Sequence, residues 1–286
     1  MVAGLALALA ALAAALAAVD QGGERSDRAQ ADPGPLHVHG LGVNPADRAL
    51  FIASHTGLFR LGQGEREALR VAGRYQDTMG FTVVGPDRFL GSGHPDVREA
   101  REQPLPSRLG LVRLTDAGRS WNPVSLLGEA DFHVLRIARR RIYGFDATDG
   151  ALRVSRDGGR NWSRYSVPAP LIDLAADPTG SSRLVATTER GLYASADEGR
   201  TWSMVGDGVG FLAWPAPRRL YLASAGGQLF VSPDAGKRWR QVGDIGGKPA
   251  ALLAADRQEL YAALQNGTIM RSADGGGSWG LRSRPS

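Results

Sequence analysis

The chain has 286 residues, no cysteine, 38 glycines, 16 prolines and a formal net charge of +5. The absence of cysteine excludes disulfides and thiolate metal sites, and the glycine and proline content favours many short strands joined by tight turns. The arginines are spread beside acidic residues, with one run of three at 139–141, so the sequence argues against a nucleic-acid partner.

Residues 1–19 differ in kind from the rest of the chain. They contain no charged side chain, and a polar segment that ends in prolines follows at 20–36. This pattern is typical of a signal peptide with Ala15-Leu16-Ala17 as its cleavage site, although no Lys or Arg precedes the apolar run. The run is also long enough to remain as a membrane anchor. We expect an exported protein that is periplasmic, secreted or membrane-anchored, with 20–36 as a flexible linker and membrane contact only through an uncleaved N-terminal segment.

A short motif recurs along the remainder of the chain. The pattern S-x-D-x-G-x-x-W, called a box below, occurs at 155–162, 195–202, 232–239 and 272–279, and a fifth copy around Asp116 has Leu114 in place of the serine. The five aspartates, at 116, 157, 197, 234 and 274, are 37–41 residues apart, and a fixed period of this size indicates a repeat architecture. Ser and Asp side chains can hold a turn by binding backbone N–H groups, and the tryptophan can bury its ring on the outgoing strand. The boxes therefore predict the fold and carry no chemistry of their own.

On these boxes the sequence resembles the Asp-box, or bacterial neuraminidase repeat, β-propellers. That group includes sialidases, other glycoside hydrolases, sortilin-type receptors and photosystem assembly factors. The resemblance covers about residues 37–286 and implies that each box joins the third and fourth strands of a blade, on the face away from the usual ligand site. Because one fold serves many functions, the resemblance does not fix an activity.

Working back from the boxes predicts an all-β propeller with six blades. Each blade has an apolar first strand, a second strand and a third strand that leads into the box. The expected strands lie within 37–61, 79–114, 132–155, 171–195, 210–232 and 250–272. The first blade has no box and a plain turn at 62–64. Only seven residues follow Trp279, so the last blade ends in a short strand, or the ring closes with a strand from the segment before His37.

One connection is much longer than the others. Residues 94–108 join the second and third strands of the second blade and contain three prolines and several charged residues. Long loops on a repeat scaffold are functional lids or loose connectors, and the sequence leaves both open.

All five histidines, at 37, 39, 55, 94 and 133, fall in the first three blades. Alignment of the first strands puts His39, Met79 and His133 in one position, where the later blades have Ile172, Phe211 and Ala251. The start of a first strand and the turn between the second and third strands lie on one face of a propeller. We therefore expect the histidines at one mouth of the ring, together with Tyr75, Gln76, Asp77, Asp96, Glu129, Asp131 and Asp146.

Three interpretations of this sector remain open. The first is a hydrogen-bonded polar plug in the central channel. The second is a pocket for a sugar or peptide, with His37, His39, His94, His133, Gln76 and Asp77 as its binding residues. The third is a metal site formed by His37, His39, Met79, His94 and His133. Imidazoles with a thioether would favour copper, whereas imidazoles with carboxylates would suit zinc or another divalent ion.

Enzyme activity is the alternative to binding. A sialidase in the strict sense is not expected, because the Arg-Ile-Pro motif of that family is missing: Arg136-Ile137 is followed by Ala138. Another glycoside hydrolase would need two carboxylates, for which the candidates are Asp77, Asp96, Asp131 and Asp146, with Tyr75 as a further catalytic candidate. We expect an exported binding or scaffold module for a glycan, peptide or protein ligand at the mouth, with a glycoside hydrolase of sialidase-like build as the alternative.

Overall fold

A computed structural model describes residues 32–285. The expected signal or anchor at 1–19 and most of the expected linker lie outside the described residues. Within the described part, the longest regular helix is α1 (Val97–Glu102), and none is long and apolar enough to cross a bilayer.

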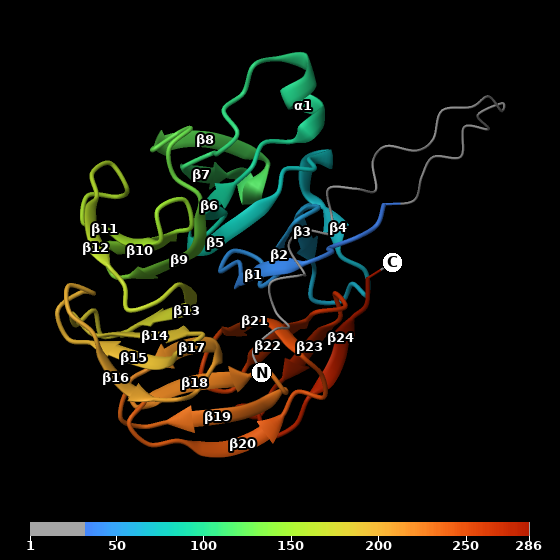
Figure 1. The fold of residues 1–286 in the computed structure, drawn as a ribbon. Coiled ribbons are helices and arrows are strands. Elements are labelled where there is room, and N and C mark those ends of the chain that lie inside the picture. Colours follow the sequence, from blue (N-terminus) through green and yellow to red (C-terminus); the bar gives the residue numbers. More distant parts are fainter. Residues whose placement is uncertain (1–31, 286) are drawn as a thin grey trace, which may run out of the picture. The chain divides into compact units, whose positions relative to one another are not determined.

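Six four-stranded antiparallel sheets surround a central axis (Figure 1), so the predicted six-bladed all-β propeller is confirmed. The first three blades are β1 (Val38–Val43), β2 (Leu50–Ser54), β3 (Gly57–Leu61) and β4 (Leu69–Arg70); β5 (Thr78–Gly85), β6 (Arg88–Gly93), β7 (Leu111–Thr115) and β8 (Ser120–Ser125); and β9 (Phe132–Ala138), β10 (Arg141–Asp146), β11 (Ala151–Ser155) and β12 (Ser163–Ser166). The last three are β13 (Leu171–Ala176), β14 (Leu184–Thr188), β15 (Gly191–Ser195) and β16 (Ser203–Gly206); β17 (Gly210–Ala216), β18 (Arg219–Ser224), β19 (Gln228–Ser232) and β20 (Arg240–Asp244); and β21 (Pro249–Ala254), β22 (Leu260–Leu264), β23 (Ile269–Ser272) and β24 (Gly280–Ser283). Two short 3-10 turns, η1 (Val71–Gly73) and η2 (Asp116–Gly118), complete the elements.

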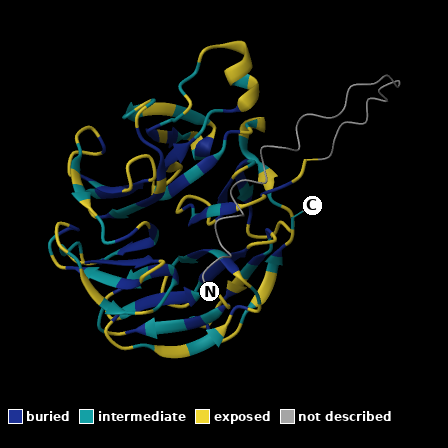
Figure 2. Cartoon of the chain, viewed as in Figure 1, coloured by how far each residue is buried: buried dark blue, intermediate teal, exposed yellow. Residues whose placement is uncertain are grey.

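The hydrophobic core is divided into six layers, each between two neighbouring blades. The second strand of a blade is therefore packed on both faces and reads as a continuous run of apolar and small residues, as in β2 and β22, where every residue is buried. The outermost strands are half-buried or exposed (Figure 2). Because each layer joins residues of different blades, the ring is stabilised as a whole.

The boxes form the turns between the third and fourth strands. In the fifth blade, the buried Ser232 hydroxyl accepts a hydrogen bond from the Gly236 N–H at 2.8 Å, and the Asp234 carboxylate accepts one from the Arg238 N–H at 2.9 Å. The Trp239 indole N–H in turn donates to the Gly236 carbonyl at 3.0 Å. The predicted role of these residues as turn formers is confirmed by this geometry.

The box glycine also makes the contact between blades. Its backbone φ is positive, +91° at Gly159, and a Cβ added there would lie 2.2 Å from a methyl group of Leu111 on β7 of the preceding blade. A leucine on the preceding third strand approaches in the same way at every other box, opposite Gly118, Gly199, Gly236 and Gly276. Thus each box fixes the distance between two blades.

The ring closes without a borrowed strand. All four strands of the last blade come from residues 249–283, and residues 32–36, the described part of the segment before His37, form no strand. Instead, β1 packs against β21, and the Arg282 guanidinium donates to the carbonyls of Gly62 and of Glu65, the latter at 2.6 Å. Arg282 therefore links the last blade to the turn after β3 of the first blade, where the box is missing.

The long connection at 94–108 contains the helix α1. Asp96 caps its first turn by accepting a hydrogen bond from the Arg98 N–H at 2.9 Å, and Glu99 lies three residues later. This spacing is the sequence signature of a helix start, which the interpretation as a loop overlooked.

Candidate functional site

The histidines of the first three blades meet at one end of the ring. We call the side chains of His37, His39, His55, Asp77, His94, Asp131 and His133 the histidine mouth. Five members occupy the residue before an inner strand or the residue after a second strand, and His39 and His133 lie within the inner strands β1 and β9. Backbone hydrogen bonds show this equivalence, because the His55, His94 and Ala147 N–H groups donate to the carbonyls of His37, Asp77 and Asp131 respectively. Since strands alternate in direction, the boxes lie at the opposite end.

His39 and His133 are the extra residues of equivalent β-bulges. On β1 the register shifts between Val38 and Gly40, and on β9 it shifts between Phe132 and Val134. A bulged residue is unpaired and bends its strand, which redirects its side chain. Both imidazoles line an axial cavity of about 250 Å³ formed by the inner strands of all six blades. The alignment of these two histidines was therefore structurally sound, whereas Met79, on the irregular part of β5, is not among the residues that line the cavity.

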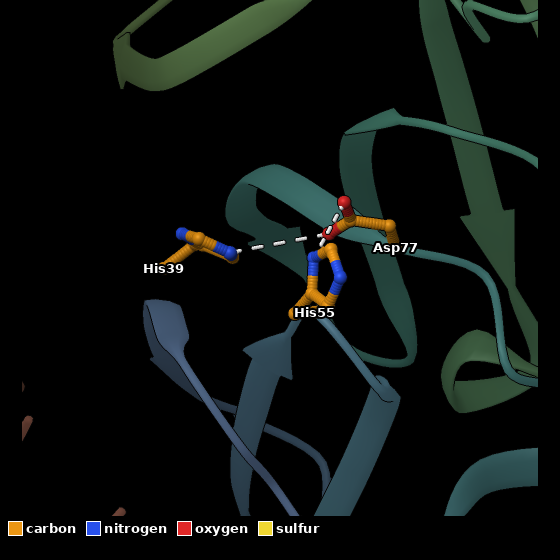
Figure 3. Close-up of side chains that lie close together, drawn as sticks. All are labelled: His39, His55 and Asp77. Atoms are coloured by element: carbon orange, nitrogen blue, oxygen red, sulfur yellow. Dashed lines mark ion pairs between the residues drawn. The ribbon is translucent and has the colours of Figure 1, made fainter. Parts of the chain in front are cut away.

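The first cluster of the mouth is centred on Asp77 (Figure 3). The His55 Nδ1 atom lies 2.8 Å from Asp77 Oδ2, and the His39 Nε2 atom lies 3.9 Å from Asp77 Oδ1. His39 comes from β1, His55 from the turn between β2 and β3, and Asp77 from the residue before β5, so the cluster bridges the first and second blades. Asp77 and His39 are largely buried, with side chains 14% and 26% exposed, while His55 is 54% exposed.

The second cluster repeats the first at the junction of the second and third blades. Asp131 Oδ2 lies 2.9 Å from His133 Nε2 and 3.6 Å from His94 Nε2. The His94 Nδ1 atom lies 2.7 Å from the Ser107 carbonyl oxygen, which can only accept, so Nδ1 carries the proton. The Nε2 atom of His94 is therefore the ring nitrogen that faces Asp131. His37 completes the set with an edge-on ring contact to His55 at 6.2 Å.

The pKa values of three groups in the mouth are shifted, and the two carboxyl groups are shifted in opposite directions. Burial, together with the neighbouring imidazoles of His133, His55 and His37, lowers the pKa of His39 to about 4, so this ring is neutral at pH 7. Burial also raises the pKa of the Asp77 carboxyl. Burial acts on Asp131 in the same direction, but the hydrogen bond and charge of His133 and the charge of His94 outweigh it and lower the pKa of Asp131.

Several buried polar atoms at this end have no hydrogen-bond partner. In residues 32–285 there are six such side-chain atoms, and four belong to the mouth or its edge: His39 Nε2, Asp77 Oδ1, Asp131 Oδ1 and Gln76 Oε1. A buried polar atom without a partner costs about 1–3 kcal/mol, and such atoms are few in native proteins. Four of the six therefore lie at one end of the channel.

The remaining predicted residues have structural contacts. The Asp96 carboxylate accepts hydrogen bonds from the backbone N–H of Tyr75 and pairs with Arg98 at 2.6 Å, which lowers its pKa to about 2. Asp146 is fully buried and accepts from the Asp131 N–H at 3.0 Å and from Arg153 at 2.8 Å. The Tyr75 ring lies between two guanidinium groups, 3.6 Å from that of Arg70 and 4.1 Å from that of Arg98. The structure thus leaves Asp77 and Asp131 as the carboxylates with free coordination positions among the four candidates.

A charged pair that was not predicted from the sequence also lines the channel. Arg136 Nη2 lies 2.5 Å from Asp173 Oδ1, and the Asp173 carboxylate also accepts from the Leu174 and Leu212 N–H groups. Burial raises the pKa of Asp173, and Arg136 opposes that shift. A single aspartate inside the apolar strand Leu171–Ala176 was the available signal. His55 was expected at the mouth but had been assigned no binding role.

Neither a protein-family model nor a curated protein matches the sequence. Solved structures do resemble the fold. YCF48 from Cyanidioschyzon merolae is 17% identical over 87% of this chain and 86% of that chain, with a TM-score of 0.53. A structure described as YCF48 bound to D1 peptide is 16% identical over 87% of this chain and 82% of that chain, with a TM-score of 0.55.

A GH74 xyloglucanase from Xanthomonas campestris is 20% identical over 87% of this chain, with a TM-score of 0.55. This chain spans only 45% of the length of that enzyme. At such identities the similarity shows the β-propeller fold alone. A peptide-bound protein and a hydrolase share that fold, so the fold does not choose between binding and catalysis.

Proposed function

We propose that the chain is an exported binding module and that a peptide segment of its ligand enters the histidine mouth. The observation that carries this proposal is the group of buried, unpartnered atoms at that end of the channel, which include Asp77 Oδ1, Asp131 Oδ1 and Gln76 Oε1. A ligand that supplies partners to these atoms removes their desolvation penalty, which favours binding at this end of the channel.

The chemistry of the three acceptor atoms defines the ligand. Carboxylate and amide oxygens accept hydrogen bonds, so the ligand must present hydrogen-bond donors. Backbone amides in an extended segment and the side chains of Lys or Arg meet this requirement, and a cation gains additionally from the two carboxylates. The four exposed or half-exposed imidazoles around the acceptors offer flat surfaces for the rest of the segment.

Binding is favoured over catalysis because few groups are free to react. Asp96 and Asp146 are committed to structural hydrogen bonds, and Tyr75 is held between two arginines. The similarity to a peptide-bound YCF48 is consistent with a propeller that binds protein segments. Export rests on the apolar residues 1–19, and mass spectrometry of the mature N-terminus tests it: an intact Met1 on protein found only in the cytoplasm would contradict export.

Selection from a random peptide library against the full chain tests the binding proposal. We expect the enriched peptides to contain Lys or Arg. These peptides should bind at least ten times more weakly to Asp77→Asn or Asp131→Asn than to the wild type, because asparagine removes the negative charge of the carboxylate but keeps the size of the side chain. Lys237→Ala, in a box at the opposite end of the ring, is the matched control. Peptides that bind all four proteins equally would place the site elsewhere and refute the proposal.

A glycoside hydrolase is the second candidate. The specific observation in its favour is that the pKa of Asp77 is raised while that of Asp131 is lowered, the pattern expected of a general acid beside an ionised carboxylate. Hydrolysis of any member of a glycan panel that disappears in both Asp77→Asn and Asp131→Asn would establish this candidate, and a lack of hydrolysis across the panel would eliminate it.

A further inference from the structure

The geometry points to a binding site for a divalent transition-metal ion, of the zinc class, formed by His39, His55 and Asp77. One ligand atom from each of these residues lies within 4.8 Å of the other two. The three come from separate segments of the chain, at residues 39, 55 and 77, which the fold brings together where the first two blades meet (Figure 3). This set differs from the one predicted from sequence, because it contains a carboxylate and lacks Met79.

The distances fit an ion after small movements. Zinc bonds to imidazole nitrogen and carboxylate oxygen are about 2.0–2.2 Å long, so two ligand atoms of a tetrahedral site lie roughly 3.3–3.5 Å apart. The 3.9 Å between His39 Nε2 and Asp77 Oδ1 is too long for a hydrogen bond and close to that separation. His55 is 54% exposed and its ring can rotate toward the same centre.

Two of the ligand atoms lack any other partner. His39 Nε2 and Asp77 Oδ1 are both buried without a hydrogen bond, although hydrogen-bonding groups surround them. In an apo protein each of these atoms is a net cost, and a cation between them would satisfy both at once.

The donor types select the class of ion. Two imidazole nitrogens and a carboxylate oxygen suit zinc and similar divalent ions. The chain has no cysteine, and Met79 does not line the cavity, so the soft ligands that copper(I) prefers are missing. Three protein ligands leave a fourth coordination position open toward the mouth.

The second cluster shows why the first one is singled out. His94, Asp131 and His133 have the same residue types, but His133 Nε2 lies 2.9 Å from Asp131 Oδ2, whereas the equivalent His39 Nε2 is buried without a partner. Among the described residues, the three ligand atoms lie within 4.8 Å of one another in the first cluster and not in the second. His94 therefore provides a matched control, since it occupies in the second blade the position that His55 occupies in the first.

Titration of zinc chloride into the chelator-treated full chain, with a competing fluorescent chelator, tests the inference. We expect one zinc ion per chain, with affinity reduced at least tenfold in His55→Ala and in Asp77→Asn and changed less than threefold in His94→Ala.

Because His55 is exposed, His55→Ala should fold normally, and an unchanged melting temperature in EDTA confirms this. At a hundredfold excess over Kd, zinc should raise the melting temperature of the wild type by about 5 °C. Cobalt(II) in place of zinc should give the visible absorption of a four-coordinate site.

Two outcomes overturn the inference: no binding tighter than about 10 µM, or a loss in His94→Ala as large as in His55→Ala. The metal site does not depend on the proposed peptide ligand. Peptide binding is measured separately in EDTA. A chain that binds peptide but does not bind zinc refutes only this inference, and a chain that binds zinc but no peptide refutes only the proposed function.

Discussion

Two adjacent glycines in one box allow the contact between blades to be measured directly. Gly158 and Gly159 both have positive φ, +78° and +91°, so alanine at either position adopts a strained backbone that costs about 1–2 kcal/mol. A Cβ at Gly158 meets no atom within 4 Å, whereas a Cβ at Gly159 lies 2.2 Å from the fully buried Leu111 of the preceding blade. Only the second substitution therefore adds an overpacking cost of about 1–3 kcal/mol.

Thermal unfolding of Gly158→Ala and Gly159→Ala compares the two costs. For a domain of this size 1 kcal/mol corresponds to about 2–4 °C in the melting temperature, so we expect Gly158→Ala to melt a few degrees below the wild type and Gly159→Ala to melt about a further 2–12 °C lower. Gly199→Ala, whose Cβ would lie 2.2 Å from Leu152, should behave like Gly159→Ala. Equal midpoints for Gly158→Ala and Gly159→Ala would refute the conclusion that the box glycine fixes the spacing of the blades.

Three further predictions concern the turns, the mouth and the closure of the ring. Ser232→Ala leaves the buried Gly236 N–H without its acceptor and should cost about 1–3 kcal/mol in a chemical denaturation; no change would mean that water replaces the hydroxyl. The pKa of His39 is lowered to about 4 from its ordinary 6.5. Below pH 6.5 the His39 ring is therefore protonated in the unfolded chain, whereas in the folded chain it stays neutral down to about pH 4. The free energy of unfolding consequently falls as the pH drops over this interval. His39→Asn should remove about 1–3 kcal/mol of that fall between pH 7 and pH 4, and an identical pH profile for variant and wild type would contradict a neutral, buried ring. Arg282→Ala removes hydrogen bonds to the Gly62 and Glu65 carbonyls and should cost about 1–2 kcal/mol, with increased protease sensitivity at the first and last blades; unchanged cleavage would show that apolar packing alone closes the ring.

The fold could be predicted because its determinants are local. In the four boxes that contain the serine, the serine, aspartate and glycine interact within four residues, so the pattern of letters already contains the hydrogen bonds. The helix α1 was not predicted, although its Asp96 and Glu99 signal is equally local.

The mouth could be predicted only in outline. Repeat alignment placed His39 and His133 in equivalent positions, and the bulges on β1 and β9 give the physical basis. Which carboxylates remain free depends on contacts between distant segments, such as Asp96 with Tyr75 or Asp146 with Asp131. No spacing in the sequence reveals these contacts, because they join segments 21 and 15 residues apart whose proximity depends on the folded blade.

Histidine-selective NMR tests most directly whether the mouth is the functional site. All five histidines of the chain belong to the mouth, so ring-labelled histidine places every probe there and none elsewhere. On addition of a library-selected peptide in EDTA, we predict that the His39 and His133 signals, assigned with His39→Asn and His133→Ala, shift or broaden at the same peptide concentration at which binding is measured. Saturating peptide binding with all five histidine signals unchanged would contradict the account.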